Sequence, residues 1–395
     1  MRRIHHMSIT REGLFYLAVM GIILVAAIIR QINLLMLLYG VLAGPLLISW
    51  SLVRQTLKKV DVARKCPPTV TAGERFRVEL TATNNKRRGS SFSVAVRDEL
   101  KPRGEPNSKI IGTEVYLPYL PVRQPKLASY EGVLDERGLY DFQPIKISTR
   151  YPLGLLRTML RIDRPQRLIV LPRPGRLSPR WQRLWKAEDS DVGGPRRTTG
   201  MQDGDFYGLR EWRAGDSRSR IHWRTTARRQ ALTVRQFERK RQMTVALVVD
   251  LRLLEKPTPE DRRRVEDVIR FAATVVTDVC REAGRPLSLE IVGRSVKSIH
   301  APSSPQVLEE ALKSLALAEP AAKDLLPATL GKLFERLRPG SNLLIVGPRK
   351  TALDDAERFA ELVGREDFRA WSTRAATLAP DDALWSQLFQ QESRR

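Results

Sequence analysis

The sequence predicts a multidomain protein with an N-terminal transmembrane helical hairpin, a β-sandwich-like domain and a C-terminal doubly wound α/β domain. Three observations predict this mixed all-β and α/β class. Two long uncharged apolar runs open the chain, and short segments that alternate apolar and polar residues follow them. After residue 243, continuous apolar strands alternate with amphipathic helices. A chain of 395 residues is long enough for two or three such folded units.

The hairpin is expected at 1–57. Gly13–Ile29 is a run of 17 residues without a charge, and Leu34–Val53 is a run of 20. As helices they would measure about 25 and 30 Å, close to the bilayer core of about 30 Å. Only four residues, Arg30 to Asn33, separate the runs, which permits a tight hairpin. A cleaved signal peptide is the alternative, but no small-residue cleavage site precedes the second run.

Basic residues flank the hairpin on both outer sides. They are Arg2, Arg3 and Arg11 before it, and Arg54, Lys58, Lys59, Arg64 and Lys65 after it. Only Arg30 lies between the two runs. The positive-inside rule then puts both ends in the cytoplasm. We therefore expect a protein of the cytoplasmic (inner) membrane with two transmembrane helices and the bulk of the chain in the cytoplasm.

The charge of the chain is strongly positive and unevenly distributed. The net charge is +24, and residues 244–395 carry 23 basic and 23 acidic side chains, so the whole excess precedes them. This indicates an anionic surface near the front half, and we expect anionic membrane lipid at the juxtamembrane basic residues. The sequence has no helix-turn-helix, zinc-finger or aromatic-rich RNA-binding pattern, so no specific nucleic-acid partner is expected.

Two globular domains follow, at 58–171 and 244–395. In the first, short alternating strands separated by turn clusters predict an antiparallel sandwich or small barrel; they are expected near 76–83, 92–97, 115–120, 145–147 and 168–171. In the second, apolar strands are expected at 244–249, 287–292 and 343–346, with helices at 259–283, 306–317, 326–337 and 354–364.

Residues 172–204 are expected to be a linker, because glycine and proline recur through them. Trp181 and Trp185, four residues apart, predict one short amphipathic helix within it. The segment 205–243 that follows is rich in arginine and tryptophan. Between 205 and 241 it has eleven basic and four acidic residues, and arginine outnumbers lysine ten to one. Arginine is favoured where planar, bidentate pairing with carboxylate or phosphate is needed.

This segment resembles the signature of the domain of unknown function 58 family. The matching positions are Gly208, Arg210, Trp212, Gly215, Asp216, Arg220, Ile221, Trp223, Ala227 and Arg228. The resemblance implies two membrane helices, a β-rich segment, the motif and a von Willebrand factor A-like α/β domain. It also implies a MoxR-type AAA+ ATPase as partner, with which the protein would act on an unknown client protein in assembly or maturation.

We expect the motif to be a partner-binding or domain-bridging segment. A carboxylate among this many arginines is expected to take a bidentate pair, so Asp216 is predicted to accept one. We further expect Asp216 to hold the segment against the α/β domain, with Trp212 and Trp223 as apolar anchors. His222 is expected to be a structural hydrogen-bond partner.

No metal site or cofactor is expected. In metal-binding von Willebrand factor A domains the first strand ends in D-x-S-x-S, which supplies oxygen ligands to Mg²⁺ or Ca²⁺. Here Asp250 stands alone, because Leu251 and Arg252 follow it and both serines are missing. Asp250 is therefore a degenerate site, expected to pair with an arginine. The two cysteines, Cys66 and Cys280, have no partner motif.

These observations favour a non-enzymatic function, with no catalytic residue assigned. The expected protein is a membrane-anchored adaptor or scaffold that acts with a MoxR-type AAA+ ATPase. Two alternatives stay open. One is a hydrolase whose site lies at the junction of the β-sandwich-like and α/β domains, and the other is a basic module that binds anionic lipid or nucleic acid.

Overall fold

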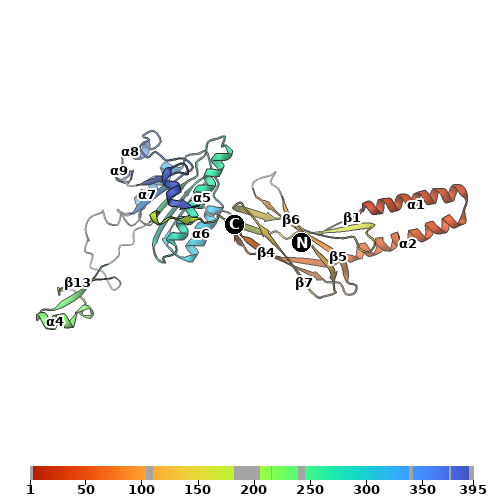
Figure 1. Ribbon diagram of the computed structural model, residues 1–395, viewed down its shortest axis with the longest axis horizontal. Coiled ribbons are helices and arrows are strands. Elements are labelled where there is room, and N and C mark those ends of the chain that lie inside the picture. Colours follow the sequence, from red (N-terminus) through yellow and green to blue (C-terminus); the bar gives the residue numbers. More distant parts are fainter. Residues whose placement is uncertain are drawn as a thin grey trace. The chain divides into compact units, whose positions relative to one another are not determined.

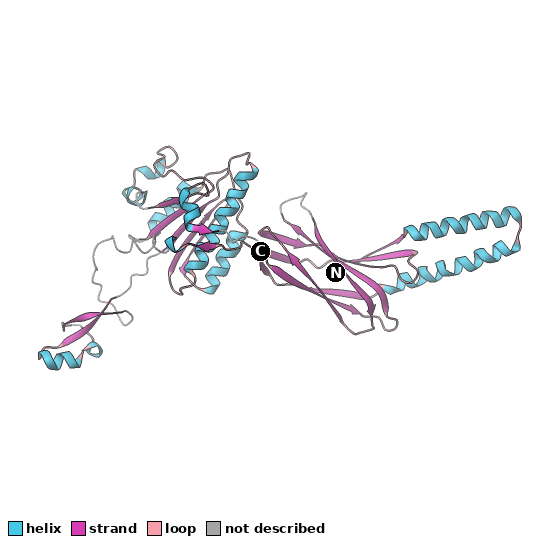
Figure 2. Ribbon diagram, viewed as in Figure 1, coloured by secondary structure: helices cyan, strands magenta, loops and turns pink. Residues whose placement is uncertain are grey.

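The computed structural model describes residues 3–103, 110–181, 205–214, 216–238, 245–337, 341–372 and 375–390. The chain divides into two compact units, one formed by Met1–Arg173 and the other by almost all of Pro174–Arg395. The first unit combines a helical pair with two β-sheets, and the second is α/β (Figures 1 and 2). The structure is therefore of mixed α/β class, with two N-terminal apolar helices.

The helical pair consists of α1, Arg11–Arg30, and α2, Asn33–Thr56, which run side by side (Figure 1). Both are long and apolar enough to cross a membrane, with mean hydropathies of 2.3 and 1.8. Their most apolar stretches are only 17% and 11% buried, unlike core helices of a soluble protein. The Tyr16 hydroxyl donates to the Leu42 carbonyl at 2.7 Å and links the two helices.

A strand that the sequence did not predict precedes the hairpin. β1, Arg3–Ile9, pairs antiparallel with β10, Leu156–Ile162, so the expected hairpin range 1–57 includes a strand of the β domain. Only Thr10 separates β1 from α1, and three residues separate α2 from β2, Val60–Lys65. Both helices thus start and end at the same folded domain, and the hairpin returns the chain to the side from which it leaves.

The β domain is built from two sheets with an apolar core. The larger sheet has the order β1-β10-β9-β5-β8-β11-β3, with β6 paired to β5, and the smaller has the order β2-β4-β7. The further strands are β3 Thr69–Thr71, β4 Arg75–Asn84, β5 Ser91–Pro102, β6 Ile111–Leu120, β7 Lys126–Val133, β8 Gly138–Phe142, β9 Ile145–Thr149 and β11 Arg167–Leu171. The core alternates along the strands, as in Phe76, Val78, Leu80 and Ala82 of β4. This confirms the all-β character expected for the segment.

The α/β unit contains a five-stranded sheet in the order β17-β16-β15-β18-β19. Its parallel strands are β15 Val245–Asp250, β16 Pro286–Val292, β18 Asn342–Val346 and β19 Ala376–Leu378. The edge strand β17, Val296–Pro302, is antiparallel and was not predicted. Every residue of β15 is buried, because the central strand has both faces covered.

The expected helices are present in this unit, with one marked difference. They are α5 Pro259–Val279, α6 Pro305–Ala316 and α7 Leu326–Arg336. The helix expected at 354–364 is reduced to one turn, α8, Ala360–Val363, preceded by turns. The remaining helices are α9 Glu366–Ser372 and α10 Ala383–Leu388. The side chains of α7, α8 and α9 share one core with the sheet.

From Pro174 on, the described part of the expected linker belongs to the α/β unit. β12, Arg176–Leu177, pairs with β20, Phe389–Gln390, and Trp181 packs edge-on against Phe271 of α5 at 5.6 Å. Trp181 is only 4% exposed, so the chain is already part of a core at this point. The rest of the expected linker, including Trp185, lies outside the described residues.

The arginine- and tryptophan-rich segment forms a small hairpin module. β13, Asp205–Glu211, and β14, Thr233–Glu238, are antiparallel, with a register shift between Phe206 and Gly208. The connection between them carries a short 3-10 helix, Arg218–Arg220, and α4, Trp223–Arg229. Among the module's side chains that the structure describes, Ile221, Thr233 and Val234 are buried.

Candidate functional site

A bidentate ion pair closes the connection of the hairpin module. Nη1 and Nη2 of Arg210 on β13 donate to the two carboxylate oxygens of Asp216 at 2.7 and 2.6 Å. The backbone N–H of Arg213 donates to the same carboxylate at 2.8 Å, which fixes the turn between them. The expected bidentate pair of Asp216 is thus confirmed, with Arg210 of its own hairpin as partner.

Each partner of this pair stabilises the charged form of the other. Hydrogen bonds from Arg210 lower the pKa of Asp216, with further contributions from the Arg213 N–H and the charge of Arg220. The hydrogen bonds to Asp216 likewise raise the pKa of Arg210. The pair is therefore ionised at neutral pH and holds the short helices of the connection in place.

The two tryptophans of the module differ in environment. Trp212 is half-buried, and its backbone N–H donates to the Leu232 carbonyl at 2.7 Å. Trp223 is 65% exposed, so it is not an anchor within the hairpin module itself, and its anchoring of the segment against the α/β domain stays a prediction. Trp223 is the first residue of α4, directly after the N-cap residue His222.

The outer face of α4 presents an aromatic ring among arginines. Trp223, Arg224, Ala227 and Arg228 are all exposed, and their spacing puts them on one side of the helix. The inner side is held by Thr226, whose hydroxyl accepts from the Thr233 N–H at 3.0 Å. We call the four exposed residues the α4 face; its chemistry suits planar and anionic groups.

His222 begins this helix. Its ring accepts a hydrogen bond from the Thr225 N–H at 3.3 Å, and Nδ1 lies 2.8 Å from the Thr225 hydroxyl. Its backbone N–H donates to the Thr233 carbonyl at 2.8 Å. The expected structural role of His222 is therefore that of an N-cap, which places Trp223 at the helix start.

A second charged cluster lies at the carboxyl end of β15. Nη2 of Arg358 is 3.1 Å from Oδ2 of Asp250, and the same guanidinium donates to Asp324 at 2.7 and 3.3 Å. Arg252 also donates to Asp324, at 2.8 Å, while its backbone N–H donates to Asp250 at 3.1 Å. The Asp355 carboxylate accepts from the Arg358 N–H and so fixes the turn that supplies the guanidinium.

Burial and charge act against each other in this cluster. Burial raises the pKa of Asp250, although the charge of Arg358 opposes the shift. Burial works in the same direction at Asp324, but hydrogen bonds from Arg358 outweigh it and hold the pKa of Asp324 below its usual value. For Arg358, burial is outweighed by the two carboxylates, which raise its pKa. The guanidinium is therefore the fixed positive charge of this edge.

These residues do not fit a divalent metal ion. A hard cation needs an oxygen cage, and the Asp250 carboxylate is instead shared between a guanidinium and a backbone N–H. Arg358 lies between the two carboxylates that such an ion would require. Among the described residues there is no group of three or more histidine, cysteine or carboxylate side chains that could hold a metal ion. The absence of a metal site remains a prediction.

A serine, a histidine and a glutamate meet on β16 and β17. The Ser288 hydroxyl lies 2.7 Å from Nδ1 of His300, and Nε2 of His300 lies 3.0 Å from Oε1 of Glu290. Ser298 donates to the other oxygen of Glu290 at 2.5 Å. Although the order of groups matches a catalytic triad, Ser288 is only 5% exposed, which leaves no approach for a substrate carbonyl. The network instead satisfies a buried carboxylate beside an edge strand.

The β domain also encloses a charged pair. Nε of Arg64 donates to Asp98 at 2.8 Å, and the Tyr130 hydroxyl donates to the same carboxylate at 2.8 Å. Both charged side chains are almost fully buried, and the guanidinium lies over the Phe142 ring at 4.0 Å. Burial raises the pKa of Tyr130, so the phenol stays protonated as a donor. This pair stabilises the sandwich core and offers no accessible site.

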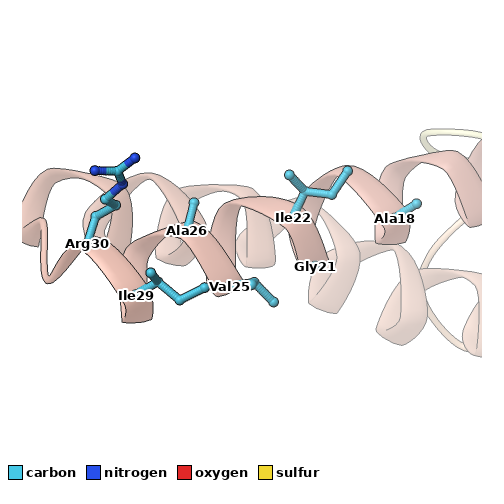
Figure 3. Close-up of a pocket in the computed structure, with 7 residues that line it drawn as sticks. All are labelled: Ala18, Gly21, Ile22, Val25, Ala26, Ile29 and Arg30. Atoms are coloured by element: carbon cyan, nitrogen blue, oxygen red, sulfur yellow. The ribbon is translucent and has the colours of Figure 1, made fainter.

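A shallow groove follows α1 between Ala18 and Arg30 (Figure 3). Its lining is apolar except for the Arg30 side chain, which lies at the end of the helix. None of the lining residues is a nucleophile or a general acid or base. The groove is part of the exposed apolar surface of a helix that is long and apolar enough to cross a membrane.

The predicted site residues thus separate into groups. Gly208 and Arg210 lie on β13, Trp212 follows it, and Asp216 and Arg220 lie in the connection, where Arg210 and Asp216 meet. Trp223 and Arg228 lie on the exposed α4 face. Gly215 lies outside the described residues. Sequence reasoning missed Arg358, Asp324, Ser288 and Glu290; the alternation of polar residues within the strand 287–292 was the one available signal.

Comparison with known proteins supports the resemblance for part of the chain. The family model described as "Protein of unknown function DUF58" matches residues 208–363, from the hairpin module into the α/β unit. No curated protein matches the chain. The match supports the family resemblance without assigning an activity.

The matches to solved structures cover only a limited part of this chain. The CARDB domain of PF1109 from Pyrococcus furiosus is 13% identical, with a TM-score of 0.19 over 28% of this chain and 95% of that one. A β-glucosidase from Listeria innocua is 15% identical, with a TM-score of 0.20 over 28% of this chain and 16% of that one. A superoxide reductase from Ignicoccus hospitalis is 15% identical, with a TM-score of 0.17 over 28% of this chain and 78% of that one.

Proposed function

We propose that the protein is a membrane-anchored adaptor whose hairpin module docks a partner protein. The observation that carries the proposal is the α4 face. Trp223 is 65% exposed beside Arg224 and Arg228, on a module whose fold is maintained by other contacts. Exposed aromatic and arginine side chains are the residues that most often dominate protein–protein binding. The side chains that form the face are therefore free to serve recognition rather than folding.

The family resemblance supplies the partner. Proteins with this motif are associated with MoxR-type AAA+ ATPases, and we propose such an ATPase, acting on an unknown client in assembly or maturation, as the partner of this chain. The strand order of the α/β unit, with its antiparallel edge strand β17, supports a von Willebrand factor A-like domain. In place of the metal ion of that family, the unit would carry the Arg358 guanidinium.

The membrane anchor is the helical pair α1 and α2. Its two ends return to one folded domain, so both must lie on the same side of the membrane. The basic flanks favour the cytoplasmic side of an inner membrane. Reporter fusions at residue 60 and at the C-terminus should both report cytoplasm. A periplasmic signal from either fusion would contradict the topology.

Site-specific photocrosslinking in cells tests the docking surface. A photoreactive amino acid at Ala227, in the centre of the α4 face, should crosslink to the ATPase. The matched control is the same residue at Ala231, which is also exposed but lies beyond the end of α4. Equal crosslinking from both positions would contradict a specific α4 face. Crosslinks to nucleic acid instead would favour the alternative of a basic nucleic-acid-binding module.

A further inference from the structure

Short connections hold the β domain next to the end of the helical pair. One residue joins β1 to α1 and three residues join α2 to β2. An extended chain spans at most about 3.6 Å per residue, so three residues reach about 10 Å. If the pair spans the membrane, as the proposed function holds, this end of the β domain must touch the bilayer surface.

Loops distant in the sequence are fixed at the helix ends. The Thr10 hydroxyl donates to the Gly154 carbonyl at 2.6 Å, which ties the loop before β10 to the start of α1. The Ser91 hydroxyl donates to the Thr56 carbonyl at 2.6 Å, and Lys86 Nζ donates to it at 3.0 Å. The Asn84 side-chain N–H donates to the Leu120 carbonyl at 3.3 Å. Five segments therefore share this end of the domain, namely 10–13, 56–61, 84–93, 118–124 and 149–157, and we call them the rim.

The rim is strongly basic. Its five segments carry nine basic and two acidic residues. One of the acids, Asp61, is already paired with Arg164 at 2.6 Å. Most of the basic side chains are exposed, among them Lys58, Arg87 and Arg150. Basic residues next to a membrane are attracted to anionic headgroups, and the attraction falls off within a Debye length of about 8 Å.

The rim also exposes apolar and aromatic side chains. Leu153, in the loop tied to α1, is 54% exposed. Phe92 is 37% exposed and stacks on Tyr151 at 5.0 Å, while Tyr119 lies directly opposite it on β6 and is 46% exposed. Next to the rim, in the last two turns of α2, Trp50 lies under the guanidinium of Arg54 at 4.9 Å. Aromatic rings and basic side chains together are typical of the interfacial layer of a membrane.

We propose that the rim is a lipid-binding surface, at which the β domain inserts Leu153 and its aromatic neighbours among anionic phospholipid headgroups of the membrane that the hairpin spans. The inference rests on the proposed anchoring and extends it. The helices supply insertion, and the rim holds the β domain against the bilayer. The partner is a lipid surface because the apolar and basic groups lie at the depth where headgroups meet acyl chains.

The test uses the full chain in nanodiscs with and without phosphatidylglycerol. Both natural cysteines are replaced by alanine, because burial raises the pKa of the Cys66 thiol to about 11 and would make its labelling slow and uneven. An environment-sensitive fluorophore is attached at Leu153→Cys. The matched control is Val133→Cys, which is 47% exposed and pairs with Arg75, at the opposite end of β4 from the rim.

We expect a blue-shifted emission and strong quenching by headgroup-labelled lipid at position 153, and neither at 133. The quenching should increase with phosphatidylglycerol, and Arg87→Glu with Arg150→Glu should abolish that increase. Equal quenching at both positions, or no effect of anionic lipid, would overturn the lipid-binding rim. Flotation with vesicles after a carbonate wash reports on the anchor separately. If the chain floats but position 153 is unquenched, only the rim fails; if it does not float, the anchor fails too.

Discussion

Nη2 of Arg358 lies 3.1 Å from Oδ2 of Asp250, so a guanidinium stands at the carboxyl end of the central strand of the α/β sheet. The carboxyl ends of parallel strands are where ligands bind in open α/β folds. In this chain the position is occupied by an internal cation that also pairs with Asp324. The edge is thereby built as a fixed ion-pair network of Arg358, Asp250 and Asp324.

Removal of the guanidinium should destabilise the α/β unit. Arg358→Ala leaves Asp250, 7% exposed, and Asp324 without their shared partner, and we expect a loss of about 3–5 kcal/mol in the free energy of unfolding. Arg294→Ala is the matched control, because Arg294 pairs with Glu319 in an exposed position and should cost about 0–1 kcal/mol. Urea unfolding measures both. Equal costs would mean that the cluster is not structurally important.

Divalent ions should leave the stability of the protein unchanged. The Asp250 carboxylate is already held by Arg358 and by the Arg252 N–H, so Mg²⁺ or Ca²⁺ finds no free oxygen cage. We expect the same melting temperature with EDTA, with Mg²⁺ and with Ca²⁺. An ion at 100 times its dissociation constant would stabilise by about 2.7 kcal/mol. A rise of that size would show that the ligand argument is wrong.

The loss of stability at low pH should depend on Asp324. Its pKa is lowered in the folded state from a usual value of 3.8, because Arg358 outweighs burial. The stabilisation is therefore present above about pH 4 and is lost as the pH falls through the folded pKa. Asp324→Asn should lower the melting temperature at pH 6. Below about pH 4, the difference in melting temperature between the variant and the unmodified protein should become progressively smaller.

Asp250 provides the opposite sign in the same experiment. Burial raises its pKa, so its contribution is largest at low pH and declines as the pH rises through the folded pKa. The melting temperature of Asp250→Asn, relative to that of the unmodified protein, should therefore rise as the pH increases. Parallel trends for the two variants would contradict the assigned directions.

The buried serine should be unreactive. Ser288 is 5% exposed although it contacts His300, so a fluorophosphonate probe should not label it in the folded protein. The protein should likewise not turn over a small-molecule trypsin substrate analogue or a lipase substrate. Any background turnover should be the same in Ser288→Ala. Labelling that disappears in Ser288→Ala would instead revive the hydrolase alternative, at a site on β16 rather than between the domains.

The sequence predicts elements better than contacts. The apolar runs, the alternating strands and the long amphipathic helix α5 each carry a periodic pattern, and the structure contains them. β1 was missed because Arg3–Ile9 looked like the basic flank of a membrane helix, and only its pairing with β10 makes it a strand. β17 was missed because Lys297, Ser298 and His300 are exposed and polar, as expected of an edge strand.

In the candidate site, too, contacts between residues close in the sequence could be predicted and contacts between distant residues could not. The Arg210–Asp216 pair is six residues apart and lies within one turn-forming motif, so composition alone could predict it. The partner of Asp250 is 108 residues away, and no local spacing indicates Arg358. The exposure of Trp223 could not be predicted either, because an aromatic residue in a short helix suits a core and a docking face equally well.

The most direct test of the adaptor function is the affinity of the full chain, reconstituted in nanodiscs, for the MoxR-type ATPase. Trp223→Ala and Arg228→Ala, alone and combined, should weaken binding by at least about tenfold, as expected of hot-spot residues. Their melting temperatures should equal that of the unmodified protein, since both side chains are exposed. Arg294→Ala, an exposed arginine of the α/β unit, should bind normally. Unchanged affinity in the double variant, or no binding by the unmodified protein, would contradict the account.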